Sequence, residues 1–264
     1  MQGKMTDPAL LRDEIERLGP WHLEVQVTPD VSTRVWTEMQ SRLQLDPADK
    51  VPFMDPRPDL ESQIRRIYPD GLAGRSVLDC ACNCGGYSFH AKELGAGECF
   101  GFDVREHWIK QARFLLQNRT AGPTDAMRFE VCDLYDVPNM RLQPFDITLF
   151  MGIFYHLPDP ISGLKIAADL TRELMVVNTA TKSGLPDGLL AIARESRELV
   201  LSGVYGLNWL PTGPDVIAQA LRWAGFVETY LVWWKQEVSP GRGRLEMLAS
   251  KKAGLLDAFR KANS

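Results

Sequence analysis

The sequence predicts an α/β protein with a doubly wound, mostly parallel sheet. Two observations support this fold class. Short apolar segments typical of buried strands alternate with amphipathic segments of helical period over residues 76–177. Such alternation implies parallel strands joined by right-handed crossover helices. The strand-like segments end in loops of small or acidic residues, the kind found at the carboxyl ends of parallel strands.

The composition fits one large folded chain. It has 264 residues, is 45% hydrophobic and carries a formal net charge of −4, so whole-chain disorder is excluded. Mild acidity argues against a surface built mainly for nucleic acid or anionic lipid. The longest apolar run, 147–155, is about half of the roughly 20 residues that span a bilayer. Three of the five cysteines lie within five residues, and we see no signal peptide, so we expect a cytoplasmic protein with reduced thiols.

The chain is expected to begin with a cap segment, residues 1–60. Its first 20 residues have apolar positions at helical spacing, and the alternation in 20–30 predicts a strand or hairpin. Four prolines make 46–60 an irregular connector. The main domain is expected over 61–264.

The main domain is expected to hold the sheet. The predicted strands are 76–79, 99–103, 127–131, 146–151 and 174–177, and the predicted helices are 86–94, 105–119 and 159–171. Residues 181–213 are rich in Gly, Ser and Pro and predict a lid insertion with a helical piece near 189–201. A helix at 214–224 and a strand pair at 226–235 and 245–250 follow.

The loop after the first strand is built from small residues that let a ligand approach the backbone. Gly85 and Gly86 can adopt backbone angles denied to other residues. Ala81 and Asn83 stand where a dinucleotide fingerprint requires glycine, and no Gly-Lys-Ser/Thr follows. The expected ligand therefore lacks a pyrophosphate.

Acidic residues end the second and third strands. Asp103 lies 24 residues after Asp79, where a carboxylate can accept hydrogen bonds from both hydroxyls of a ribose; the alternative is a helix N-cap. Asp133 is expected either to accept from an exocyclic amine of adenine, with Leu134 packed on the ring, or to stabilise a turn. Gly152 would open space after the fourth strand, with Tyr155 and His156 facing a substrate.

Four motifs occur in order: VLDCACNCGG, FGFDV, VCDLYDVP and FDITLFMGIFYHLPDP. Together, over residues 72–180, they resemble class I S-adenosylmethionine (SAM)-dependent methyltransferases, whose sheet has seven strands and a reversed last strand. One departure is Ala81, which replaces the usual glycine. The resemblance implies SAM as cofactor and places its binding on Asp79, Ala81, Cys82, Asn83, Gly85, Asp103, Val104, Asp133, Leu134, Met151 and Gly152.

More narrowly, FMGIFYHLPDP, PWHLEVQVTPD and NWLPT are similar to the tRNA wobble-uridine carboxymethyltransferase-like group and its small-molecule relatives. We expect methyl transfer to a small molecule such as a sugar, phenol or natural-product intermediate. The alternatives are a tRNA wobble-uridine (carboxy)methyltransferase, against which the net charge argues, and a non-catalytic SAM-binding module. Ala81 and the closing strand pair argue against an NAD-dependent dehydrogenase.

The residues around the acceptor are expected as follows. His156 is the candidate general base, because a free histidine titrates near neutral pH; the alternative is a histidine bonded to backbone. Tyr155 would bind substrate or shape the pocket. Substrate contact or burial is expected for Trp21, His22, Asn208 and Trp209, and Arg242 and Arg244 form a solvated hairpin tip or bind an acidic group. No metal is expected, because single-residue spacing crowds the Cys80, Cys82 and Cys84 thiols.

Overall fold

The computed structural model describes residues 4–33, 57–199 and 201–260. Most of the predicted proline-rich connector, 46–60, lies outside the described residues; its last residues begin a helix. Within the described part, no helix has the length and apolarity needed to cross a bilayer.

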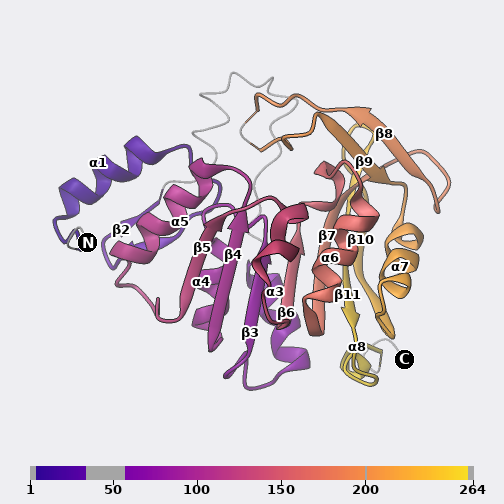
Figure 1. The fold of residues 1–264 in the computed structure, drawn as a ribbon, viewed down its shortest axis with the longest axis horizontal. Coiled ribbons are helices and arrows are strands. Elements are labelled where there is room, and N and C mark those ends of the chain that lie inside the picture. The colour runs from indigo at the N-terminus through magenta and orange to yellow at the C-terminus, as the bar shows by residue number, and fades with distance from the viewer. Residues whose placement is uncertain (1–3, 34–56, 200, 261–264) are drawn as a thin grey trace. The chain divides into compact units, whose positions relative to one another are not determined.

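A seven-stranded sheet organises the chain, in the strand order β10-β11-β7-β6-β3-β4-β5 (Figure 1). The registered pairs β3–β6, β6–β7 and β4–β5 are parallel. Strand β11 runs antiparallel to both β7 and β10. The predicted fold class, including the reversed strand near the end of the chain, is confirmed.

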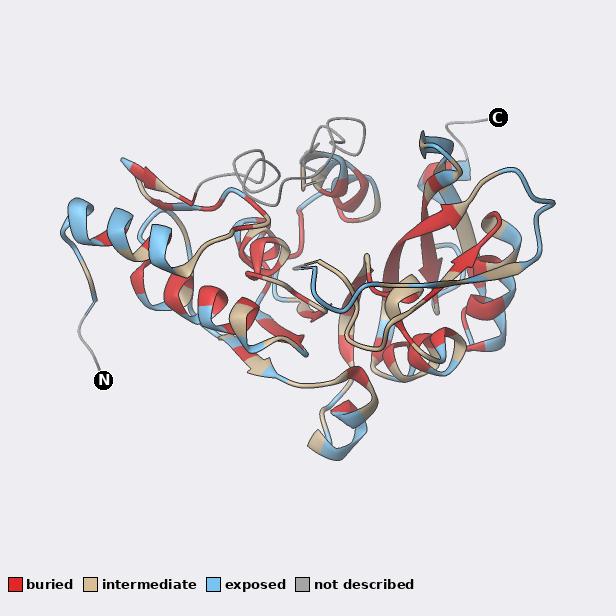
Figure 2. Ribbon diagram, turned by 90° about the horizontal axis from the view of Figure 1, so that it is seen from above, coloured by how far each residue is buried: buried red, intermediate tan, exposed pale blue. Residues whose placement is uncertain are grey.

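The amino-terminal elements are short. Helix α1 (Pro8–Leu18) precedes a two-stranded hairpin of β1 (Gln26–Thr28) and β2 (Val31–Ser32), as the alternation predicted. Helix α3 (Arg57–Ile67) was not predicted. In Figure 2, α1 is mostly exposed, whereas most strands of the sheet, though not its two edge strands, are mostly buried.

The central elements follow the predicted order. The strands are β3 (Ser76–Cys80), β4 (Glu98–Asp103), β5 (Met127–Val131), β6 (Phe145–Met151) and β7 (Thr171–Lys182). The helices are α4 (Gly86–Glu93), α5 (Glu106–Asn118) and α6 (Pro160–Asp169), with 3-10 turns η2 (Leu134–Met140) and η3 (Phe154–His156). Strand β7 is much longer than predicted, because β11 pairs along it from Leu174 to Lys182.

The helical piece predicted near 189–201 is wrong. Residues of the insertion form β8 (Leu190–Arg194) and β9 (Leu207–Pro211), which pair antiparallel as a separate two-stranded sheet. Helix α7 (Pro214–Trp223), β10 (Glu228–Ser239), β11 (Arg242–Ser250) and α8 (Asp257–Arg260) complete the chain. Tertiary pairing with β9 overrides the helix-forming residues of this segment.

Contacts between Cα atoms divide the chain into two compact units. The first comprises Met1–Arg75 and Cys82–Cys132, and the second comprises Ser76–Ala81 and Asp133–Ser264. In the first unit, α1, the hairpin residues and α5 share a core that includes Leu11, Leu23 and Phe129. The boundary predicted after residue 60 stays a prediction.

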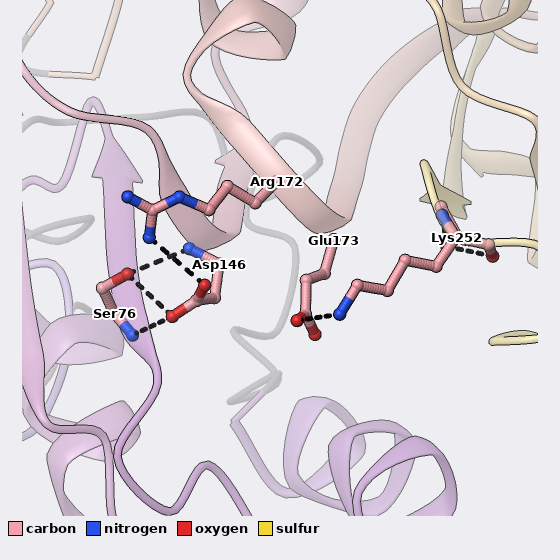
Figure 3. A network of polar contacts seen from close by, with 6 residues as sticks. Ser76, Asp146, Arg172, Glu173 and Lys252 are labelled. Carbon is pink, nitrogen blue, oxygen red and sulfur yellow. Dashed lines mark hydrogen bonds and ion pairs between the residues drawn. The ribbon is translucent and has the colours of Figure 1, made fainter.

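A polar network joins the starts of β3, β6 and β7 in the second unit (Figure 3). One Asp146 carboxylate oxygen accepts from both the backbone N–H and the hydroxyl of Ser76, each at 2.9 Å. The Ser76 hydroxyl accepts the Asp146 N–H at 3.0 Å, and Arg172 donates to the second carboxylate oxygen at 3.4 Å. Glu173 pairs with Lys252 nearby. This network fixes the relative register of β3 and β6.

Candidate functional site

The backbone after β3 repeatedly enters the left-handed region. The φ angles are 55° at Ala81, 53° at Asn83 and 79° at Gly85. A side chain at Gly85 would bring a Cβ within 2.7 Å of the Phe129 ring, so glycine is required there by both conformation and space. The loop is closed by Gly85 N–H donating to the Cys82 carbonyl at 2.8 Å. The amino end of α4 thus follows a tight turn with small side chains.

Two further contacts hold this turn in the first unit. The Asn83 side-chain oxygen accepts the Cys84 N–H at 2.7 Å, and the Cys82 N–H donates to the Phe102 carbonyl at 2.9 Å. Burial raises the pKa of the Cys84 thiol to about 11, so this cysteine stays protonated at neutral pH. Cys84 therefore acts as a small apolar side chain in this turn.

Asp103 ends β4 with its side chain almost fully buried. Its carboxylate accepts the Asn83 N–H at 3.1 Å and the Arg105 N–H at 2.9 Å. Burial raises its pKa to about 6, even though both backbone hydrogen bonds act to lower it. The capping alternative for Asp103 is thus present in part, but each carboxylate oxygen has capacity for a second donor. Val104, the next residue, is 40% exposed, so its apolar side chain is open to a ligand.

Asp133 precedes the 3-10 turn η2 in the second unit. One of its carboxylate oxygens accepts the Tyr135 N–H at 3.0 Å, which caps the turn. The other accepts the hydroxyl of Tyr205, a residue of the insertion. Leu134 is buried and lies close to Gly163 of α6. The turn function expected as the alternative for Asp133 is observed, and the contact with Tyr205 was not predicted.

The end of β6 has space beside a fixed cation. Gly152 has a φ of 77° and donates its N–H to the Asn178 carbonyl at 2.8 Å. A Cβ added to Gly152 would lie 3.6 Å from a terminal nitrogen of Arg244. Met151 directly precedes this glycine and is half-buried. The predicted space after the fourth strand is therefore bordered by a guanidinium.

Arg244 is held by a chain of buried polar groups. Its Nε donates to the Asn178 side-chain oxygen at 2.5 Å, and the Asn178 amide nitrogen donates to Glu246 at 2.9 Å. Asn178 and Glu246 are each only 3% exposed. Arg244 lies in β11, opposite Ala180 of β7, rather than at a solvated hairpin tip. Arg242 is exposed, so the hairpin-tip interpretation suits Arg242 alone.

His156 ends η3, four residues after Gly152. Its Nδ1 lies 2.7 Å and 3.0 Å from the two carboxylate oxygens of Glu195, a residue of the insertion. The Gly203 N–H approaches the same nitrogen at 3.0 Å. The side chains of His156 and Glu195 are 17% and 9% exposed. His156 thus contacts a carboxylate, which was not predicted, and also a backbone group, the Gly203 N–H, as the alternative interpretation expected.

The neighbours of His156 come from η3 and β9. The Tyr155 ring lies 4.0 Å from the imidazole, centroid to centroid. Asn208 is 2% exposed and donates to the Tyr155 carbonyl at 3.3 Å, and the Trp209 ring nitrogen donates to the Pro158 carbonyl at 3.1 Å. Asn208 and Trp209 therefore attach the insertion to the segment after β6.

Trp21 and His22 lie in the first unit. Trp21 is 3% exposed, and its ring nitrogen donates to the Ile15 carbonyl at 2.7 Å. This position favours the packing interpretation of Trp21 over substrate contact. His22 is half-buried.

A separate cavity of about 490 Å³ lies in the first unit. It is lined by Glu24, Val25, Gln26, Arg57, Glu61, Phe89, His90, Glu93 and Arg119, and thus by none of the predicted site residues. Asp79 is 2% exposed within β3. Over the described ranges, no three His, Cys, Asp or Glu side chains are arranged to hold a metal ion.

The sequence analysis did not single out Glu195 or Tyr205. It placed Arg244 either at a solvated hairpin tip or on an acidic group. Glu195 lies 39 residues from His156, and Tyr205 lies 72 residues from Asp133. No periodicity or motif links such pairs. The only sequence signal for Arg244 was its positive charge next to the predicted strand at 245–250.

Several known proteins are similar to this chain. The tRNA U34 carboxymethyltransferase of Campylobacter lari is 28% identical over 184 residues, covering 61% of this chain and 62% of the relative. The protein of the same name from Azotobacter vinelandii is 29% identical over 236 residues, covering 85% and 69%. The matches to the relatives from C. lari, C. hominis and Idiomarina loihiensis span 62%, 31% and 33% of their lengths, less than two thirds in each case.

Solved structures share the fold. The N-terminal domain of EvdMO1 with SAH bound has a TM-score of 0.73 and 19% identity, covering 94% of this chain and 98% of that one. The same domain in the presence of SAH and D-fucose gives 0.72 and 18%, with the same coverage.

A family model described as a methyltransferase domain matches residues 72–219, more than half of the chain. This range begins just before β3 and includes the insertion and most of α7. The chain therefore belongs to the methyltransferase-domain family, and the enzyme class predicted from its sequence motifs is confirmed.

Proposed function

We propose that this SAM-dependent methyltransferase modifies the wobble uridine of tRNA and that the group it transfers is a carboxymethyl group. The relatives named tRNA U34 carboxymethyltransferase support this reading over the small-molecule acceptor that we expected first. The structural observation that carries the proposal is the guanidinium of Arg244 beside Gly152. A carboxymethyl group carries a negative charge at neutral pH, which a plain methyl group does not.

The proposed donor is a SAM-type sulfonium. Asp103 would accept the ribose hydroxyls, with Val104 beside the adenosyl group, and Asp133 would accept the adenine amine. The methionine part would lie along the turn of Asp79, Ala81, Cys82, Asn83 and Gly85. The reacting carbon would lie near Met151 and Gly152. The support is the position of each residue at the carboxyl end of its strand, where ligands of such sheets bind.

Arg244 suits recognition of a carboxylate next to the reacting carbon. Its Nε is used by Asn178, and Glu246 fixes Asn178 in turn, so the guanidinium has a set direction. The outer edge of a guanidinium binds a carboxylate through two parallel hydrogen bonds. The space left by the missing side chain at Gly152 lies against the Arg244 terminal nitrogen.

The chemistry needs alignment more than activation. The acceptor atom forms a bond to the carbon on sulfur while the carbon–sulfur bond breaks, and the thioether leaves with the electron pair. The acceptor must also lose its proton. We assign removal of that proton to His156, the histidine four residues after Gly152. Tyr155 would shape the pocket on the acceptor side.

A small-molecule acceptor is the second candidate. Its support is the net charge of −4, since tRNA binding generally uses a basic surface. A tRNA gel shift at low salt separates the two candidates.

The test uses the purified chain, tRNA and either SAM or its S-carboxymethyl analogue, with mass spectrometry of the digested nucleosides. We expect the mass of a carboxymethyl group on a wobble uridine. Arg244→Ala should lower carboxymethyl transfer about tenfold or more, the worth of a charged hydrogen-bonded pair. Arg242→Ala, an exposed arginine of the same strand, is the matched control and should change nothing. Equal loss in both variants, or no gel shift together with methylation of small phenols or sugars, would overturn the proposal.

A further inference from the structure

We propose that Glu195 is a positioning residue that works through His156: it holds the proton on Nδ1 and leaves Nε2 free to take the proton of the acceptor. This inference rests on the proposed function of His156 and adds to it a residue from the insertion. The observation that carries it is the pair of short contacts between Nδ1 and both Glu195 oxygens, at 2.7 Å and 3.0 Å.

The chemistry of the two groups fixes the proton. An ionised carboxylate only accepts hydrogen bonds, so a proton shared between Glu195 and His156 must be on the imidazole nitrogen. Burial of Glu195 opposes ionisation, but hydrogen bonds from His156, Asn208 and Gly203 outweigh it and lower the pKa of Glu195. Neutral imidazole has one N–H, so a proton on Nδ1 leaves a lone pair on Nε2.

The Gly203 N–H could in principle favour the other tautomer, because it lies 3.0 Å from Nδ1. A Glu195 carboxylate oxygen lies closer to Nδ1 than this N–H does, at 2.7 Å. A charged acceptor binds a donor more strongly than a neutral one. The shorter contact to the charged carboxylate therefore keeps the proton on Nδ1, in spite of the Gly203 N–H beside it.

The insertion holds Glu195 in place by close packing. A Cβ added to Gly203 would lie 2.8 Å from a Glu195 oxygen and 2.8 Å from the His156 Cβ. Asn208, 2% exposed, adds a side-chain hydrogen bond to Glu195. The titratable groups facing the imidazole in the described structure are Glu195, from the insertion, and Tyr155, from η3.

The proton balance of the step is complete. As the acceptor atom bonds to the donor carbon and the carbon–sulfur bond breaks, the acceptor proton passes to His156 Nε2. The resulting imidazolium is stabilised by the adjacent carboxylate and later releases the proton to water. The Glu195 carboxylate thus lowers the free energy needed to form the positive charge on His156.

The experiment compares Glu195→Gln with Glu198→Gln, an exposed glutamate three residues further along the same insertion. Nitrogen-15 NMR of the free enzyme reports which imidazole nitrogen of His156 carries the proton. We expect Nδ1–H in the parent and in Glu198→Gln, and a shift toward Nε2–H in Glu195→Gln, whose amide can donate to Nδ1. We also expect kcat to fall about 10- to 100-fold in Glu195→Gln, with the KM for the donor unchanged.

The two readouts separate this inference from the proposed function. A parent enzyme with Nε2–H, or an unchanged tautomer in Glu195→Gln, overturns the positioning role whatever the activity. The NMR shift without transfer to tRNA overturns the proposed acceptor and leaves the pair standing. Gly203→Ala changes neither His156 nor Glu195, but its added methyl group pushes the two side chains apart. It should reproduce the kcat loss in protein that still shows a cooperative melting transition. If it folds and keeps full kcat, the positioning role fails.

Discussion

The two ends of β3 and β6 differ sharply. At the amino ends, Ser76 and Asp146 satisfy each other through three hydrogen bonds at 2.9–3.0 Å, and Arg172 completes the set. At the carboxyl ends, Ala81 and Gly152 both adopt left-handed φ angles. The same pair of strands thus has one end whose polar groups bond to each other and one end with left-handed backbone, which is costly at Ala81 but not at Gly152. We expect stability to be concentrated at the first end and propose ligand binding at the second.

The largest expected change in stability comes from removing the Asp146 carboxylate, the hydrogen-bond acceptor at the amino ends of β3 and β6. Asp146→Ala leaves the Ser76 N–H and hydroxyl without their partner and should lower the free energy of unfolding by about 2 kcal/mol. Burial opposes ionisation of Asp146, but Ser76 and Arg172 lower its pKa overall. Its ionic stabilisation is therefore present above pH 4 and is lost as the pH falls through the lowered pKa.

Urea unfolding at pH 7 and pH 3 measures this effect. Asp146→Asn is the matched control, because it keeps an acceptor oxygen and should lose less at pH 7. Equal stability of Asp146→Ala and the parent at pH 7 would show that the network does not secure these strand ends.

The next effect belongs to the carboxyl end of a neighbouring strand, β4. Asp103→Ala should weaken SAM binding by about 1.5 kcal/mol or more, because charged hydrogen bonds to the ribose are lost. Calorimetry with SAM measures the change. An unchanged affinity would refute the ribose assignment.

Titration of Asp103 should also affect folding stability and SAM affinity with opposite signs as the pH changes. Its pKa of about 6 lies above the ordinary value, so its contribution to stability is complete below pH 4 and is lost as the pH rises through 6. The ionised form is the better acceptor for ribose, so SAM affinity should fall as the pH is lowered from 7.5 to 5. In Asp103→Asn that fall should disappear; a fall of the same size would assign it to another group.

The smallest effect sharpens the contrast at β3. Ala81 has a φ of 55°, which glycine adopts without strain. Ala81→Gly should raise the free energy of unfolding by roughly 1 kcal/mol at most, because relief of strain is partly offset by a more flexible unfolded chain. Ala91→Gly, in helix α4, is the control and should destabilise by about 1 kcal/mol. Destabilisation by Ala81→Gly would mean that the alanine is not strained.

The fold could be predicted because each strand of the sheet carries its own local signal. Segments such as 127–131 are apolar, short and bounded by turn residues, and β5 has these bounds. The insertion could not be predicted in the same way. Its residues near 189–201 favour a helix locally, whereas pairing between β8 and β9 decides their conformation.

The site divides along similar lines. Residues that end strands, such as Asp103 and Gly152, could be proposed for the site from position alone, and their roles stay a prediction. Glu195 and Tyr205 were not, because their roles depend on how a long insertion folds back onto η3 and η2. Arg244 was misjudged because β11 begins earlier than its apolar residues indicate.

The hydroxyl of Tyr205 has a consequence for the base of the nucleoside. The Tyr205 phenol donates to an Asp133 carboxylate oxygen and orients that group, and an ionised carboxylate offers only lone pairs to the base that we propose it binds. Adenine presents an amino group at its sixth ring position and satisfies such a partner, whereas hypoxanthine presents a carbonyl and is repelled. An inosine-containing sulfonium should therefore be a poor donor for this enzyme, and the discrimination should weaken in Tyr205→Phe.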